Sequence, residues 1–92
     1  MGRDLMPLHY AIVKHFEGGA EDCAEGVVHA LAEDYGSYKL LTRPDVEEAL
    51  ATAKENGLLD ETRCDLDEGG ELRIYYRVSD FGADMMRRYL GR

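Results

Sequence analysis

Histidine and cysteine are the side chains in this sequence that could bind a metal ion or act as a base or nucleophile. His9 and His15 are six positions apart, which is not the i, i+4 spacing that presents two imidazoles to one ion from a helix. No cysteine or carboxylate completes a ligand set with them, or with His29, at a recognisable spacing. We therefore expect no metal ion and no other cofactor, with the histidines flanking the cores of the first two helices.

The two cysteines, Cys23 and Cys64, are too few and too isolated for a disulfide framework, and no CxxC pair suggests zinc. Nothing next to either thiol in the sequence would activate it, so we expect both to be reduced, buried and inert. The stretch "DLDEGGE" lacks the spacing of a calcium-binding loop. The sequence also lacks a nucleophile elbow, a phosphate-cradling glycine loop and a paired-carboxylate motif. We expect no catalytic residues and conclude that the protein is not an enzyme.

The net charge of the chain indicates which classes of partner it could bind. The 92 residues include 11 lysines and arginines against 19 acids, for a net charge of −8. Nucleic-acid binders normally carry the opposite sign, because cations displacing counterions at phosphates supply much of their affinity. A salt-adapted source would also produce such an acidic surface, which leaves the question open. The sequence has no membrane span or signal-peptide core, so we expect one soluble, cytoplasmic domain covering residues 1–92.

Apolar residues at helical spacing predict two helices in the first third of the chain. The first covers about residues 5–17, with Asp4 as its expected cap and Pro7 tolerated in its first turn. The second covers about residues 20–34, and Gly26 within it suggests that a neighbouring helix crosses closely there. Residues 36–41 then form an extended connector or a short strand.

A third helix is predicted to begin after Thr42, which can cap it, with Pro44 in the first turn and Gly57 at its end. Strict alternation then predicts two strands, residues 61–66 and 72–78, joined as a hairpin. The order helix, helix, helix, strand, strand, helix indicates an α+β fold.

Opposite charges fix the expected register of the hairpin. Pairing residues whose numbers sum to 138 sets Asp65 against Arg73 and Glu61 against Arg77, whereas a sum of 136 opposes like charges. This register leaves residues 68–70 as a three-residue loop, with a glycine for its left-handed position.

A fourth helix is predicted after Ser79, and its apolar stripe is wider than a single contact with the core needs. We expect this stripe to form a protein interface and to make the protein a homodimer. The expected interface residues are Phe81, Met85, Met86, Tyr89 and Leu90. Exposed aromatic residues, Tyr35, Tyr38 and Tyr75, are expected to add to the contact surface.

Two motifs resemble those of winged-helix regulators of the MarR and PadR type. Leu50, Ala53 and Gly57-Leu58-Leu59 are similar to the L-x-x-L-x-x-x-G-L-[IL] pattern that closes their recognition helix, although Ala53 is smaller than usual. Residues 76–82 are similar to the Y-x-[LV]-[ST]-x-x-G pattern that leads from the wing into the last helix. The resemblance implies a winged helix, with residues 43–56 as the recognition helix and 60–71 as the wing.

The charges of these two elements oppose what the resemblance implies. Residues 43–56 hold two basic and four acidic residues, and residues 60–71 hold one basic and six acidic residues. Only Arg43, Arg73 and Arg77 offer phosphate contacts, and pairing with neighbouring acids explains them equally well. We therefore expect a small regulatory or accessory module that acts through protein–protein contacts. The alternatives are a DNA-binding transcriptional regulator with an acidic recognition helix and wing or, less favoured, an acidic mimic of nucleic acid.

Overall fold

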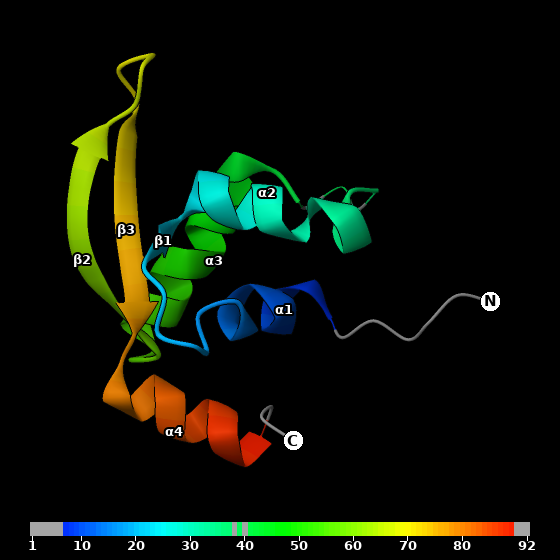
Figure 1. Cartoon of the computed structure of the whole chain (residues 1–92), viewed down its shortest axis with the longest axis vertical. Helices are drawn as coiled ribbons and strands as arrows, with labels where there is room; N and C mark the ends of the chain where they lie inside the picture. Colours follow the sequence, from blue (N-terminus) through cyan, green and yellow to red (C-terminus); the bar gives the residue numbers. More distant parts are fainter. Residues whose placement is uncertain (1–6, 38, 40, 90–92) are drawn as a thin grey trace.

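The computed structural model describes residues 7–37, 39 and 41–89, which form four helices and three strands (Figure 1). The elements are α1 (Leu8–Lys14), β1 (Asp22–Cys23), α2 (Ala24–Tyr35), α3 (Arg43–Glu55), β2 (Leu59–Leu66), β3 (Leu72–Val78) and α4 (Asp80–Tyr89). The α+β class and the order of the major elements are confirmed, with one strand added. No helix of this described part is long and apolar enough to cross a membrane.

The first helix is shorter than its apolar stripe suggested. Pro7 takes an extended conformation and serves as the N-cap, so α1 begins at Leu8 rather than including the proline in its first turn. The cap expected from Asp4 lies outside the described residues. The chain then turns, and Gly19 adopts a left-handed conformation with φ of 90°.

The prediction that a helix begins near residue 20 is wrong, because Asp22 and Cys23 form strand β1. This strand pairs antiparallel with β3, placing Asp22 opposite Tyr76. The structural reason for a glycine at position 26 also differs from the one expected. A Cβ atom there would overlap the Asp22 carboxylate, so the glycine accommodates the side chain that precedes α2 rather than a crossing helix.

The third helix follows its sequence signals closely. The Thr42 hydroxyl oxygen accepts a hydrogen bond from the Asp45 amide at 3.3 Å, and its hydroxyl donates to the Asp45 carboxylate at 2.8 Å. These bonds satisfy the exposed first turn that Pro44 enters. Gly57, with φ of 84°, ends the helix as expected and directs Leu58 and Leu59 toward the core.

The described strands form an antiparallel sheet in the order β1-β3-β2. Near the hairpin tip the register is as predicted, with Asp65 opposite Arg73, and Gly70 supplies the left-handed position of the loop. The register shifts between Glu61 and Arg63, so Asp60, not Glu61, lies opposite Arg77. The extra residue at this shift, Thr62, reverses the side-chain alternation in the part of β2 that precedes it. Leu59 therefore points into the core.

The core lies where the first three helices meet the lower half of the sheet. Its fully buried members are Phe16, Val27, Val46, Leu50, Leu59 and Met86. The hairpin tip extends beyond the helices (Figure 1). For this reason Leu66 and Leu72, although apolar, are 65% and 53% exposed. Cys23 is buried as expected, whereas Cys64 lies on the projecting hairpin and is exposed.

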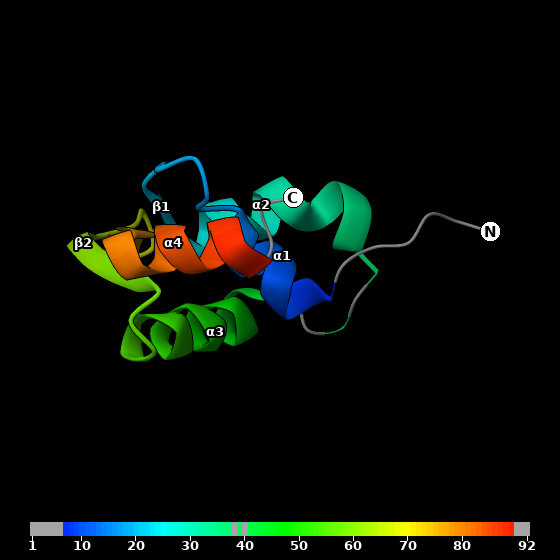
Figure 2. The same ribbon diagram turned by 90° about the horizontal axis from the view of Figure 1, so that it is seen from below.

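Helix α4 lies across the lower end of the body (Figure 2). Ser79 caps it as predicted, because its hydroxyl oxygen accepts a hydrogen bond from the Gly82 amide at 2.8 Å. Asp84 and Arg88, one helical turn apart, form an ion pair at 3.1 Å. A Cβ atom at Gly82 would overlap the Leu58 carbonyl, so this glycine sets how closely α4 approaches the segment after α3.

We expect Gly82→Ala to destabilise the fold by about 1–3 kcal/mol, because the new methyl group meets backbone that has little freedom to move. Urea unfolding followed by circular dichroism measures the change. Gly18→Ala is the matched control, since nothing lies within 4 Å of a Cβ at that position. Equal stability of the two variants would show that the close approach of α4 does not hold.

Candidate functional site

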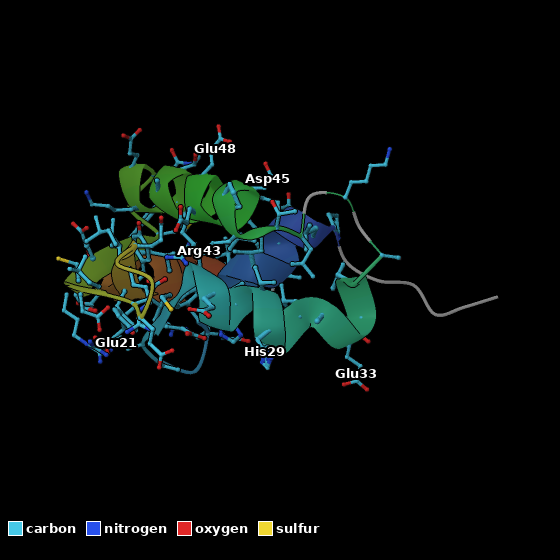
Figure 3. All side chains as sticks on the ribbon, turned by 90° about the horizontal axis from the view of Figure 1, so that it is seen from above. Glu21, His29, Glu33, Arg43, Asp45 and Glu48 are labelled. Atoms are coloured by element: carbon cyan, nitrogen blue, oxygen red, sulfur yellow. The ribbon has the colours of Figure 1, made fainter. Side chains whose placement is uncertain are left out.

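The outer face of α3 is exposed to solvent and rich in hydrogen-bond acceptors. Its opposite face, formed by Val46, Leu50 and Ala53, is buried in the core. Figure 3 shows Asp45 and Glu48 on α3, with Glu48 pointing away from the body. The exposed residues of α3 are Pro44, Glu47, Glu48, Ala51, Thr52, Lys54 and Glu55. The exposed part of the helix therefore carries glutamates toward both ends, one lysine near its C-terminal end and two small side chains in the middle.

Arg43, the first residue of α3, is turned toward the hairpin rather than toward solvent (Figure 3). Its Nε donates to Glu47 at 3.1 Å, its Nη1 donates to Asp67 at 3.0 Å, and its Nη2 donates to the Leu72 carbonyl at 3.1 Å. The hydrogen bond to Asp67, followed by that to Glu47, raises the pKa of Arg43 above its ordinary value. The Arg43 guanidinium thus joins the start of α3 to the hairpin at two places: Asp67, just after β2, and Leu72, at the start of β3.

Arg73 is also held by a carboxylate. Its Nε and Nη2 donate to the two oxygens of Asp65 at 2.9 and 3.1 Å, which is a bidentate pair. This hydrogen bonding raises the pKa of Arg73. The prediction that Arg73 neutralises its cross-strand neighbour is confirmed.

Arg77 makes a different contact from the one expected. Its Nε donates to the Gly19 carbonyl at 3.2 Å, which ties β3 to the loop before β1. The bulge has moved Glu61 out of register with it, and Glu61 instead lies 3.9 Å from the Lys54 ammonium. Each of the three arginines considered for phosphate contact therefore donates to an acceptor of its own chain.

Arg63 and Glu21 form a link that the sequence did not reveal. The Arg63 Nε donates to Glu21 at 3.1 Å, and the guanidinium carbon lies 3.8 Å from the centre of the Tyr75 ring. The hydrogen bond from Thr62, the residue at the bulge, is the main cause lowering the pKa of Glu21. Because β1 was not predicted, nothing in the sequence placed Glu21 beside the wing.

A pocket of about 290 Å³ lies between α2, α3 and β3. Arg43 and Glu47 line it from α3, and Arg73 and Tyr76 line it from β3. Burial raises the pKa of the Tyr76 hydroxyl, which keeps it protonated. The two guanidiniums thus face the same recess, one from α3 and one from β3.

The histidines do not assemble into a site. His9 and His29 are exposed, and His15 Nε2 lies 2.7 Å from the Asp22 carboxylate, where the pair links the turn after α1 to β1. Within the described residues, no three histidine, cysteine or acidic side chains gather in a way that would hold a metal ion.

The second candidate surface is a groove of about 320 Å³ between α1 and α4. Tyr89 lines it and is 68% exposed, and Met85 lines it and is half-buried. Phe81, on the same helix, is 54% exposed but does not line the groove. Met86, in contrast, is 2% exposed and belongs to the core, although it lines the floor of the groove. Leu90 lies outside the described residues.

The aromatic residues expected to extend this surface do not do so. Tyr35 is buried, and Tyr75 is half-buried with Arg63 over its ring. Tyr38 lies outside the described residues. The exposed aromatic that the sequence did not single out is Tyr10 of α1, which lines the groove.

Comparison with known proteins establishes the fold. The sequence matches no family model, and no curated protein matches it. The structure is similar to that of Bacillus subtilis PadR in complex with operator DNA, with a TM-score of 0.71 and 18% sequence identity. The match covers 92% of this chain and 48% of PadR, so the chain spans about half the length of that protein. The winged-helix fold and its likeness to PadR, which two short motifs indicated, are confirmed.

Acid should weaken the link between α3 and the hairpin. The hydrogen bond from Arg43, followed by that from the Glu71 amide, lowers the pKa of Asp67 below its ordinary value of 3.8. The stability that this carboxylate contributes is therefore fully present above pH 3.8, the ordinary pKa. It is lost as the pH falls through the lower pKa that Asp67 has in the folded state.

We accordingly expect the unfolding free energy of the wild type to fall more steeply between about pH 4 and pH 2 than that of Asp67→Asn. Urea unfolding at a series of pH values measures the difference. Glu68→Gln, on the same loop, is the control and should follow the wild type. A wild-type curve parallel to that of Asp67→Asn would contradict the assignment.

Proposed function

We propose that the chain is a winged-helix regulatory module that binds duplex DNA, with α3 in the major groove and the β2–β3 hairpin against the neighbouring backbone. The observation that carries the proposal is the similarity, over 92% of the chain, to PadR solved on operator DNA. The exposed outer face of α3 supports it, since the described helices and strands leave that face uncovered. A cytoplasmic location fits this role.

The acidic charge, on which the expectation of a protein partner rested, limits how DNA can be bound. Cations facing phosphates supply most non-specific affinity, and here the arginines near the wing are held by carboxylates and carbonyls. Binding to arbitrary duplexes should therefore be weak. The free energy of a specific complex must come mainly from contacts with base edges.

The outer face of α3 has suitable chemistry for base edges. Glutamates accept hydrogen bonds from the cytosine amino group in the major groove, and a threonine hydroxyl contacts either donors or acceptors. Glu48 and Thr52 are exposed near the middle of the helix, and Ala51 beside them leaves room for a thymine methyl group. This arrangement favours sequences that present amino groups along one side of the groove.

Selection from a random duplex library, carried out at 0.1 M and at 2 M KCl, tests the proposal. The higher salt shortens the Debye length from about 10 Å to below 3 Å and so screens the repulsion between acids and phosphates. We expect one enriched sequence class, bound at least about a thousandfold more tightly than random duplex. Failure to enrich any class at either salt would refute DNA binding.

Glu48→Gln should lower affinity for the selected duplex about 5- to 100-fold and change the preferred base at one position. Fluorescence anisotropy measures the affinity, and repeating the selection shows the preference. Glu33→Gln is the control, because it makes the same charge change on α2, on the opposite side from the outer face of α3 (Figure 3). If the two variants behave alike, α3 does not read the bases.

The groove between α1 and α4 favours a second role, as a contact with another copy of the chain. Phe81, Met85 and Tyr89 recur every four residues along α4, so two antiparallel α4 helices crossing at Met85 would set each Phe81 beside the other copy's Tyr89. The same crossing brings Asp84 near Arg88 of the other copy. A homodimer of this kind would present two α3 helices to paired half-sites on DNA.

Sedimentation equilibrium at micromolar concentration measures this association. We expect a dimer for the wild type and a monomer for Tyr89→Glu, because the substitution places a charge within the apolar contact. Leu66→Glu is a matched control, since Leu66 is similarly exposed but lies near the hairpin tip. A wild-type monomer, or a dimer unaffected by Tyr89→Glu, would show that the α1–α4 groove is not the interface.

A further inference from the structure

The two arginines that face the pocket between α3 and the hairpin are each held by a carboxylate of the hairpin. Arg43 reaches Asp67 from α3, and Arg73 reaches Asp65 from the neighbouring strand. If α3 occupies the major groove and the hairpin contacts the next groove, the backbone strand between those grooves passes across this pocket. The guanidiniums nearest to the phosphates of that DNA strand are therefore the two that are already hydrogen-bonded to carboxylates.

A carboxylate and a phosphate compete for the same donors. Both accept two roughly parallel N–H bonds from a planar guanidinium, so an aspartate paired with arginine imitates a phosphate contact. Arg73 and Asp65 have this bidentate geometry, with N–O distances of 2.9 and 3.1 Å. Arg43 divides its donors among Asp67, Glu47 and a carbonyl.

Asp67 uses its two oxygens for different purposes. Oδ1 accepts the amides of Gly69 and Glu71 at 2.9 and 2.8 Å and closes the hairpin loop. Oδ2 accepts from Arg43 at 3.0 Å. The loop can therefore keep its shape through Oδ1 while Arg43 leaves Oδ2, so exchange of this one bond does not require the hairpin to open.

The exposure of the pair also permits exchange. The side chains of Arg43 and Asp67 are 29% and 16% exposed, so water reaches both groups as they separate. Ion pairs with this degree of solvent contact are far weaker than fully buried ones, and salt weakens them further.

We propose that Asp67 is an intramolecular competitor of DNA phosphate for Arg43, which lowers affinity for duplexes until the guanidinium exchanges its carboxylate for a phosphate. The inference rests on the proposed function and adds a means of setting its affinity. Asp65 acts in the same way on Arg73. The competing carboxylates suppress binding to arbitrary DNA, while a duplex with matching base edges supplies the free energy that releases the arginines.

The test compares Asp67→Asn with Glu68→Gln on the selected duplex, by anisotropy over a range of salt. Both variants remove one negative charge from the same loop, but Glu68 takes no part in the Arg43 contact. Asparagine retains an oxygen for the Gly69 and Glu71 amides. We expect Asp67→Asn to bind about three- to fivefold more tightly than Glu68→Gln, as release of an exposed ion pair allows. The log–log salt slopes of the two variants should differ by less than the roughly 0.9 that one phosphate contact contributes, because Arg43 contacts a phosphate in both complexes.

Arg43→Gln in both backgrounds identifies the donor responsible. The gain from Asp67→Asn should disappear when Arg43 is absent. In the wild type, the Nη–H resonances of Arg43, whose Nη1 donates to Asp67, should shift on adding the selected duplex, a change that a purely structural pair would not show. If Asp67→Asn fails to fold by circular dichroism, Asp65→Asn with Arg73→Gln provides the equivalent cycle.

The outcomes separate the inference from the proposed function. If the wild type binds a selected duplex but Asp67→Asn and Glu68→Gln have equal affinities, the competition is refuted and DNA binding stands. Tighter binding that persists without Arg43 refutes it as well. If neither the wild type nor any variant binds a selected duplex, both the proposed function and the competition fall.

Discussion

The hydrogen bonds from Arg43 to Asp67 and to the Leu72 carbonyl are the contacts on which the geometry of the candidate DNA-binding surface depends. The hairpin extends beyond the helices, and the apolar residues nearest its tip, Leu66 and Leu72, are exposed rather than packed. Apolar burial therefore does not orient the tip. Arg43 instead links it to the first turn of α3 through Asp67 and the Leu72 carbonyl. The angle between α3 and the hairpin is set by polar contacts that salt, acid and anions can weaken.

Local chemistry explains which parts of the fold could be predicted from the sequence. The Thr42 cap, the stop at Gly57 and the three-residue hairpin loop each follow from a few adjacent residues whose backbone preferences are strong. The register near the tip followed from cross-strand charge pairing. Strand β1 was missed because two residues carry too little alternation to be distinguished from the start of a helix.

The bulge in β2 could have been found by comparing side-chain alternation along the strand. Strict alternation that places Arg63 outward and Cys64 inward would also place Leu59 outward, because positions 59 and 64 differ by an odd number. Leu59, however, must face the core. One extra residue between them resolves the conflict, and the structure has its register shift there. A register without this bulge places Glu61 opposite Arg77, whereas the structure places Asp60 there.

The candidate site was predicted only in part, because its contacts join residues far apart in the sequence. Arg43 and Arg73 were identified by residue type, but the pairing of Arg43 with Asp67 depends on how the hairpin leans toward α3. The link between Arg63 and Glu21 required the missing strand β1. The interface stripe on α4 was assigned from apolar spacing, which did not separate the buried Met86 from the exposed Phe81 and Tyr89.

Composition and fold lead to different expectations about the partner, and the distribution of charge reconciles them. Net charge governs long-range attraction to DNA, whereas specificity depends on the few side chains that reach base edges. A winged helix whose arginines are paired internally would have little affinity for arbitrary duplexes and would depend on the outer face of α3 for recognition. Under the proposed function, the acidic charge limits binding to arbitrary duplexes and does not exclude DNA as the partner.

The most direct test is an NMR titration of the ¹⁵N-labelled protein with a selected duplex, following every backbone amide. The account predicts that the largest shifts fall along the outer face of α3, from Glu47 to Glu55, and in the hairpin loop at residues 68–70. Shifts confined to α1 and α4, or their absence along α3, would contradict it.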